Sequence, residues 1–438
     1  MNDKRYIALI VLVFSSLILG ACAASAPKKI TLSMTALSGE VNEGLKANLA
    51  EYAKIQPNVE VNLEIQADAT AWQKSAPTTT FSGSEKPDLS WWWCSRSTSY
   101  KDMIAGDLLE PLDDLYEREG WLDAYPKGTI DYYLEPDGHR YGANIDVVWT
   151  PFIYYNKAIF QEVGVDVPTT WDEFYAISEK IRAAGYEPLA MVYEMSVRSH
   201  LPDALMMRSW TQEEYNAFMI NWSKDAPAET LQYKWTDPNG VRIFQTIKDM
   251  ADRQVLAQGF AGLTDYAQAK ALFTTGKAAM YQDGSWAGGS AALPKEATFE
   301  WGYFYYPPIQ EKAYGPVGSW LPNCFIVLKG GPNVEAAKDL VAFLLKPESQ
   351  VRWAQASGLV PGRIDLPSDQ VEKALNETSA AHINDVKKLG APALYEMVAT
   401  PKLLDTLKRA IDLMLTGGIS PQEAAAMMQE ETEKARTE

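Results

Sequence analysis

Ile30-Thr31-Leu32-Ser33-Met34 begins the stretch of sequence that decides the fold class. It alternates apolar and polar side chains, and Val59–Ile65 alternates again, which is the period of a β-strand. A helical pattern over Glu43–Ile55 separates these two strands and ends before Pro57. After a further helical stretch, Pro87-Asp88-Leu89-Ser90-Trp91-Trp92-Trp93 predicts a third strand. The order strand, helix, strand, helix, strand implies parallel pairing with helical crossovers, so we expect an α/β protein.

The same mixture of strands and helices continues to the end of the chain. Thr170-Trp171-Asp172-Glu173 has the capping-box pattern and predicts a helix that runs to about Ala184. Ser420-Pro421-Gln422-Glu423 predicts the start of the last helix in the same way. We expect further strands at 278–281, 301–306 and 325–328, and an amphipathic helix over 335–345.

The first residues have the features of an export signal. Lys4 and Arg5 precede Tyr6–Leu19, an apolar run that is too short to span a bilayer but suits the core of a signal peptide. We therefore expect residues 1–21 to be removed from the mature protein.

The end of this signal resembles the lipobox that the bacterial lipoprotein signal peptidase cuts, because it reads Leu19-Gly20-Ala21-Cys22. The resemblance implies cleavage before Cys22 and lipids on its thiol and its new amino group, with 22–27 as a lipidated tether. Two or more acyl chains anchor a protein stably, so we expect it outside the cytoplasmic membrane, at the cell surface or in the periplasm. The alternative is an ordinary secretory signal that happens to precede a cysteine.

Composition excludes several classes of function. The chain has 438 residues, of which 47% are hydrophobic, and this is enough for two domains. Its formal charge of -17 becomes -18 when residues 1–21 are removed, because they hold Lys4, Arg5 and Asp3. Such an acidic surface repels phosphate backbones, so we expect no nucleic-acid partner. With three histidines and two cysteines after Cys22, no metal-ligand spacing is present, and we expect no metal and no cofactor.

Four segments together resemble family 1 extracellular solute-binding proteins, the maltose-binding-protein-like group. They are Pro87-Asp88 with its strand; Tyr154-Tyr155-Asn156-Lys157 with Val167–Phe174; Phe273–Met280 with Asp283-Gly284-Ser285-Trp286; and Ala336-Ala337-Lys338 with Phe343-Leu344 and Gly358-Leu359-Val360-Pro361. The order and spacing of these segments, from Lys28 to the C-terminus, carry the resemblance.

The resemblance implies a two-lobed periplasmic-binding-protein-like fold of type II, with the ligand cleft between two α/β lobes. It assigns 28–147 plus 321–390 to the first lobe and 148–320 plus 391–438 to the second. Proteins of this family close around a hinge on their ligand and deliver it to the permease subunits of an ABC transporter. The implied partners are therefore a carbohydrate, the permease and, through the lipid anchor, the membrane; we expect a monomer that is not an enzyme.

A sugar has two chemically different aspects, and a sugar cleft must serve both. The faces of the ring carry C–H groups that lie well against aromatic side chains, whereas the hydroxyl rim needs paired donors and acceptors. The candidates are therefore tryptophans beside Asp, Glu, Asn and Arg at strand ends, because α/β proteins bind ligands at that edge of the sheet.

The strand that ends in Trp91-Trp92-Trp93 offers the first candidates. Alternation sends Trp91 and Trp93 to one face and Trp92 to the other, so the three cannot all line one surface. The resemblance places Trp92 and Arg96 in the cleft. The other expected ligand contacts lie at strand ends, crossovers and loops: Glu40, Asp146, Trp149, Glu194, Asp283, Trp286, Trp320 and Asn323.

The resemblance also predicts that Cys94 and Cys324 lie close together. In the resembling fold the chain crosses between the lobes near Asp146–Thr150 and again near Gly318–Asn323. The strand after the second crossing runs antiparallel to the third strand, which brings one cysteine opposite the other. An extracytoplasmic compartment allows a disulfide between them.

Two other classes of function stay open at this point. A secreted glycoside hydrolase uses the same aromatic side chains with two carboxylates, and this chain has many carboxylates. A polyamine or peptide receptor of the same fold would use acidic side chains to hold a cationic ligand.

Overall fold

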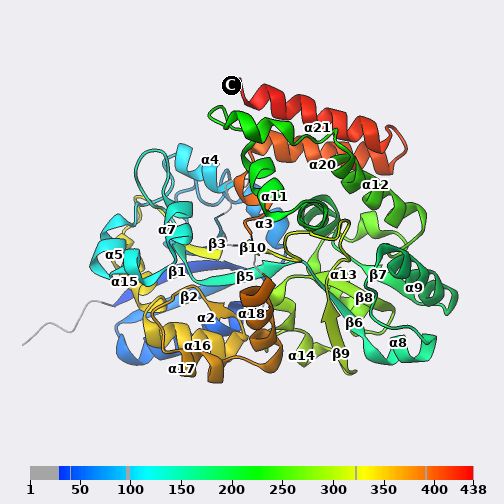
Figure 1. The fold of residues 1–438 in the computed structure, drawn as a ribbon. Coiled ribbons are helices and arrows are strands. Elements are labelled where there is room, and N and C mark those ends of the chain that lie inside the picture. Colours follow the sequence, from blue (N-terminus) through cyan, green and yellow to red (C-terminus); the bar gives the residue numbers. More distant parts are fainter. Residues whose placement is uncertain (1–28, 40, 95–98, 321–322, 390–391, 438) are drawn as a thin grey trace, which may run out of the picture.

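The computed structural model describes residues 29–39, 41–94, 99–320, 323–389 and 392–437. Two β-sheets, each with helices around it, form two lobes that lie side by side (Figure 1). We define the first lobe by the sheet with strand order β2-β1-β3-β11-β4 and the second lobe by the sheet with order β7-β8-β6-β9. Within the described residues, no helix combines the length and the apolar character that crossing a membrane requires.

The first lobe confirms the predicted parallel pairing. Strand β1 pairs in parallel with β2 and β3, and β11 runs antiparallel to both β3 and β4. Among the helices around this sheet, α2 packs against α16. The bounds of these elements are β1 Ile30–Leu37, β2 Val59–Gln66, β3 Leu89–Trp93, β4 Ala143–Asn144, β11 Asn323–Val327, α2 Val41–Ile55, α3 Ala69–Ser75, α7 Lys127–Tyr133, α15 Val334–Leu344 and α16 Pro347–Ser357.

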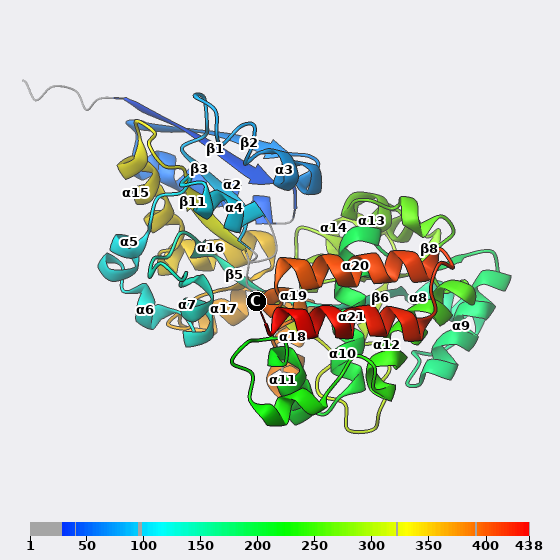
Figure 2. The same ribbon diagram turned by 90° about the horizontal axis from the view of Figure 1, so that it is seen from above.

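The second lobe is built on β8, in which every residue is buried. This strand pairs in parallel with β7 and antiparallel with β6, and β6 pairs antiparallel with β9. The last two helices, α20 and α21, lie side by side over this lobe (Figure 2). The bounds are β6 Phe152–Asn156, β7 Glu187–Ala190, β8 Ala278–Asp283, β9 Trp301–Phe304, α8 Lys157–Val163, α9 Trp171–Ala183, α10 Leu201–Ser209, α12 Pro238–Asp252, α13 Tyr266–Thr274, α20 Pro401–Leu415 and α21 Pro421–Ala435.

Both predicted capping boxes are present. The Thr170 and Ser420 hydroxyls each accept a hydrogen bond from the backbone N–H three residues on. The Glu173 and Glu423 carboxylates in turn accept one from the backbone N–H of the cap residue. Each cap satisfies backbone donors that the first turn of the helix leaves free. The helices therefore start where the sequence predicts.

The two lobes have separate hydrophobic cores. Leu32, Trp92 and Phe325 belong to the core of the first lobe, whereas Phe174 and Met280 belong to the larger core of the second. A smaller third core lies around β6 and β8. Because few buried apolar contacts cross from lobe to lobe, a bend at the junction would leave most of each core intact.

A three-stranded sheet forms the junction. In it, β5 (Asp146–Thr150) pairs antiparallel with β10 (Gly318–Trp320) on one side and with β12 (Val360–Pro361) on the other. Since β5 follows β4 of the first sheet and leads into β6 of the second, the chain passes between the lobes along this strand (Figure 1).

Helix α18 (Glu377–Leu389), which the expected limit at residue 390 assigns to the first lobe, makes contacts with the second. Its Asp385 accepts hydrogen bonds from the hydroxyls of Tyr303 and Tyr305, at 2.9 and 2.6 Å, and both tyrosines follow or belong to β9 of the second lobe. The ring of His382 lies 4.1 Å from that of Phe152, centroid to centroid. Helix α17 (Ser368–Ala374) still packs against α16 of the first lobe, so the chain reaches the second lobe only at α18.

A candidate ligand-binding cavity between the two lobes

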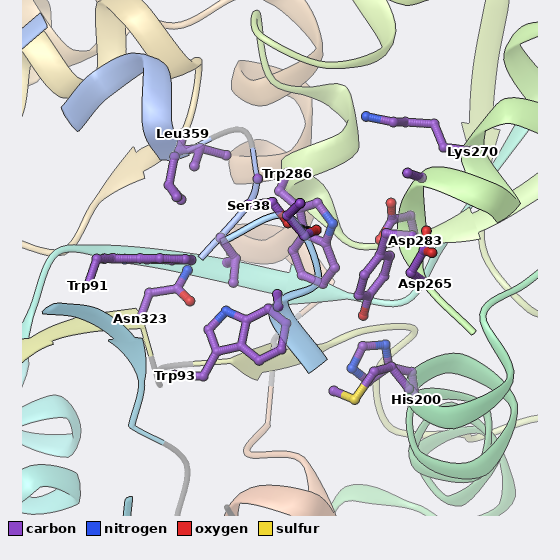
Figure 3. A pocket seen from close by; sticks show the side chains of 18 of the residues that line it. Ser38, Trp91, Trp93, His200, Asp265, Lys270, Asp283, Trp286, Asn323 and Leu359 are labelled. Atoms are coloured by element: carbon purple, nitrogen blue, oxygen red, sulfur yellow. Dashed lines mark hydrogen bonds between the residues drawn. The ribbon is translucent and has the colours of Figure 1, made fainter. Parts of the chain in front are cut away.

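A cavity of about 230 Å³ lies between the lobes and is lined by both (Figure 3). Its walls differ in character, because one lobe contributes mainly apolar groups and the other most of the polar ones. The first lobe supplies Ser38, Gly39, Val41, Ala67, Ala69, Trp91, Trp93, Asn323 and Leu359; the second supplies Met195, His200, Asp265, Tyr266, Ala267, Lys270, Tyr281, Asp283 and Trp286, and the junction supplies Val148.

The wall of the first lobe is built from alternate residues of β3. Trp91 and Trp93 point to the same face because successive strand residues point to opposite faces. Asn323 of β11 is paired directly with Trp93 of β3 and therefore shares that face. Figure 3 shows the Asn323 carboxamide between the two indole rings.

Trp92 lies on the other face of β3, and the expectation that it lines the cleft is wrong. Its side chain is completely buried in the core of the first lobe, with its ring 5.1 Å from that of Phe81. The period of two that puts Trp91 and Trp93 in the cavity excludes Trp92 from it.

Cys94 and Cys324 are joined by a disulfide, with 6.0 Å between their Cα atoms. This confirms the predicted proximity. The bond ties the end of β3 to the start of β11, the two strands that carry the tryptophans and Asn323.

The wall of the second lobe centres on Asp283 and Trp286, two of the expected ligand contacts. Asp283 ends β8, where one carboxylate oxygen accepts a hydrogen bond from the Gly284 N–H at 2.9 Å and the other accepts one from the Tyr281 hydroxyl. Trp286 lies near the middle of the cavity, with its ring close to that of Tyr266 (Figure 3). That these residues and Asn323 bind ligand stays a prediction.

The glycine in Gly284-Ser285-Trp286 permits this arrangement. A Cβ at position 284 would lie 2.0 Å from a carbon of the Trp286 ring, a distance that no two carbon atoms can share without a bond. Only glycine therefore lets the indole fold back over the end of β8.

Asp265 and Lys270 face the cavity from α13. Asp265 is the N-cap of that helix, and one of its carboxylate oxygens accepts a hydrogen bond from the Gln268 N–H at 2.9 Å. Lys270 forms an ion pair with Glu296, at 2.8 Å between Nζ and Oε1. Together with Asp283, these groups give the wall of the second lobe two carboxylates and one ammonium that is already paired.

His200 adds a neutral polar ring. It ends η1 (Tyr193–His200), and burial, with a smaller contribution from the charge of Lys408, lowers its pKa to about 3. Its Nδ1 lies 3.4 Å from the hydroxyl of Thr150 at the junction. At neutral pH the ring is uncharged and offers hydrogen bonds without a fixed charge.

Besides Trp92, three expected ligand contacts do not line the cavity. Trp149 packs in the smaller core of the second lobe, next to a separate cavity of about 10 Å³. Glu194 is held in ion pairs with Arg198 and Lys408. Asp146 is completely buried at the junction, where its carboxylate accepts a hydrogen bond from Asn323.

The remaining expected contacts cannot be placed from the structure. Glu40 and Arg96 lie outside the described residues. Trp320 ends β10 opposite Val148, but its side chain is not among those described.

Sequence reasoning missed several lining residues that have chemistry to offer. They are Trp91, Trp93, His200, Asp265, Tyr266, Lys270 and Tyr281. A strand-period argument could have found Trp93 once one residue of β3 was known to face the cleft, and Tyr281 lies two residues before Asp283 on the same strand. His200 and α13 carry no local signal, because only the fold of the second lobe brings them to the cavity. No group of three or more His, Cys, Asp and Glu side chains in the described part of the chain could hold a metal ion.

Several known proteins are similar to this chain. The sn-glycerol-3-phosphate-binding periplasmic protein of Rhizobium meliloti is 24% identical over 335 residues, which are 72% of this chain and 73% of that protein. A probable sugar-binding periplasmic protein of Brucella suis is 23% identical over 293 residues, 66% of this chain and 65% of that protein.

Solved structures share the fold. A chitin oligosaccharide binding protein superposes with a TM-score of 0.72 at 23% identity, covering 93% of this chain and 100% of that one. The maltose/maltodextrin-binding domain of Bdellovibrio bacteriovorus bound to maltotriose gives 0.68 at 20% identity, with 93% and 100% covered. The sequence profile of bacterial extracellular solute-binding proteins matches residues 38–351, well over half of the chain. This chain therefore belongs to the family of bacterial extracellular solute-binding proteins.

Proposed function

We propose that this protein captures a neutral carbohydrate outside the cytoplasmic membrane and delivers it to an ABC importer, without turning it over. The observation that carries the proposal is the cavity, where Trp91, Trp93 and Trp286 stand beside Asp265 and Asp283. Aromatic faces and hydrogen-bonding groups of this kind are what a polyhydroxylated ring needs.

The distribution of charge favours a neutral ligand. A phosphate ester, such as the ligand that names the Rhizobium meliloti relative, needs cationic or N–H donors around its oxygens. Among the described lining residues, the one lysine is paired with Glu296, His200 is neutral, and two carboxylates would repel an anion.

Calorimetric titration of the mature protein tests the proposal. The ligands are galactose, maltotriose, a chitin oligosaccharide, sn-glycerol-3-phosphate and spermidine. We expect heat from at least one neutral saccharide and none from the other two compounds. Binding of sn-glycerol-3-phosphate or spermidine alone would contradict the proposal, and release of reducing sugar from an oligosaccharide would favour the hydrolase alternative.

We also propose that Cys22 carries the lipid that holds the protein at the membrane. The support is the sequence Leu19-Gly20-Ala21-Cys22 after an apolar signal core, which lies outside the described residues. Metabolic labelling with a fatty acid should mark the wild type and leave Cys22→Ala unmarked. Equal labelling of the two proteins would refute the anchor.

A further inference from the structure

Asp146 and Asn323 form a buried side-chain pair where the junction meets the cavity. Asp146 is the first residue of β5, Asn323 is the first of β11, and the Asn323 Nδ2 donates to the Asp146 Oδ1 at 2.8 Å. Asp146 is fully buried, and its other carboxylate oxygen has no hydrogen-bond partner in the described structure. Asn323 is 7% exposed and lines the cavity.

The two ends of the Asn323 carboxamide are chemically different, so its orientation matters. One end is an NH₂ donor and the other a carbonyl acceptor, whereas an ionised carboxylate can only accept. Contact with ionised Asp146 therefore requires the NH₂ end of Asn323 to face the junction. The carbonyl end is then left for the cavity, between Trp91 and Trp93 (Figure 3).

We propose that Asp146 is a positioning residue for the cavity: its carboxylate holds the Asn323 carboxamide so that Oδ1 accepts a hydrogen bond from a ligand hydroxyl. The ligand part of this inference rests on the proposed function, but the orientation of the amide does not. Asp146 is fully buried and does not line the cavity, so this indirect role replaces the direct ligand contact that the sequence suggested.

Protonation of Asp146 removes the requirement that the NH₂ end of Asn323 face the junction. Burial raises the pKa of Asp146 to about 7, against the opposite effect of the Asn323 hydrogen bond. Four elements pack against β5: the strands β10, β11 and β12 and the turn η4 (Ser285–Gly288). They carry no other ionisable side chain, because Cys324 is in the disulfide. The Tyr133 hydroxyl, which donates to the Asn323 carbonyl of the backbone, has a pKa raised by burial and stays protonated.

A protonated carboxyl can donate as well as accept, so it tolerates either orientation of the amide. The orientation is therefore fixed above neutral pH and free below it. The affinity for a ligand hydroxyl should follow the ionised fraction of Asp146.

Two measurements test the proposal, and the first needs no ligand. In protein labelled with ¹⁵N at asparagine side chains, the Asn323 NH₂ signal is the one that disappears in Asn323→Ala. In the wild type this signal should shift with a midpoint near pH 7, and in Asp146→Asn it should not titrate. Asp265→Asn removes a cavity carboxylate that does not contact Asn323, so it should leave the midpoint unchanged.

The second measurement is the affinity of the wild type for the neutral saccharide that binds it best, at pH values on either side of 7. We expect affinity to rise with pH by on the order of 2- to 10-fold, the scale of one hydrogen bond. Asp146→Asn, which is isosteric and permits both amide orientations, should bind at the weaker level at every pH. An Asn323 signal that titrates equally in Asp146→Asn would overturn the proposal, as would wild-type affinity in that variant. Failure of every saccharide to bind would instead refute the proposed function, and the NMR titration would still decide the role of Asp146.

Discussion

The buried Asp146 carboxyl also has a consequence for stability. Its pKa is about 7 in the folded protein and near 3.8 in the unfolded chain, so the folded state holds the proton more tightly. For this group, stability is therefore greatest below about pH 4 and decreases as pH rises to about 7. The total loss is about 4 kcal/mol, because the pKa values of the two states differ by about three. Asp146→Asn should lack this loss. Urea unfolding at several pH values checks it, and stability curves that run parallel for the two proteins would contradict the raised pKa.

A single cavity tryptophan should account for much of the affinity. Trp286→Ala removes the indole at the centre of the cavity and should cost about 1–3 kcal/mol of binding free energy, the scale of one buried aromatic contact. Trp222→Ala is the matched control, because Trp222 packs against the core of the second lobe and lines no part of the cavity. Titration with the best-binding saccharide measures both, and equal losses in the two variants would mean that Trp286 acts through stability.

Of the seven expected ligand contacts whose side chains the structure describes, three lie in the cavity, and the reason differs from residue to residue. Asp283 ends β8 and Trp286 lies three residues beyond it, so local sequence predicts their position. Alternation correctly separates Trp92 from its neighbours, but it cannot say which face of β3 turns toward the second lobe. Which face turns toward the second lobe depends on the helices that cover the first sheet. The face that carries Trp92 packs into the core of the first lobe instead.

The disulfide acts on two elements, β3 and β11, that are separated by 230 residues of sequence. A cross-link over so long a loop removes much conformational freedom from the unfolded chain, and removing a native disulfide costs about 2–5 kcal/mol. We expect Cys94→Ala/Cys324→Ala to unfold at lower urea concentration than the wild type under non-reducing conditions. With a strong reductant present the two proteins should converge, and an unchanged gap would point to packing by the cysteine sulfurs instead.

Element boundaries that depend on local chemistry are the ones that the sequence predicts well. Thr170 and Ser420 define helix starts because a cap needs only neighbouring residues. Two features needed tertiary information. The π-helical turn Tyr193–His200 brings His200 to the cavity, and α18 joins the second lobe through the contacts of Asp385 with two tyrosines.

At the scale of the whole molecule, opposite charges on the two lobes attract each other at two places outside the cavity lining. Glu43 of α2 in the first lobe lies 3.8 Å from Lys295 of α14 (Leu293–Glu296) in the second. Lys46 is the main cause of the lowered pKa of Glu43, and Lys295 adds to it. Burial opposes the ionisation of Glu194, but Lys408, Arg198 and, from the first lobe, Lys74 of α3 lower its pKa. Since the signs alternate between the lobes, these contacts fit one closed arrangement.

These pairs should adjust closure rather than drive it. Glu43 and Lys295 are 42% and 55% exposed, and exposed ion pairs contribute at most about 1 kcal/mol. A ligand that touches both walls has a larger effect, because only a difference in affinity between the open and closed states shifts their populations. We therefore expect small-angle scattering to show a smaller radius of gyration when the best-binding saccharide is added.

Glu43→Lys tests the contribution of the ion pair to that closure. It replaces attraction to Lys295 by repulsion, so we expect saccharide affinity to fall by at most about 5-fold at low salt. The loss should shrink at high salt, where screening acts over about 3 Å. Adding Lys295→Glu restores opposite charges and should recover the affinity. Glu60→Lys is the matched control, because Glu60 pairs with Lys29 within the first lobe and should leave both affinity and scattering unchanged. If the double variant binds no better than Glu43→Lys, the charges act within their own lobes and not between the lobes.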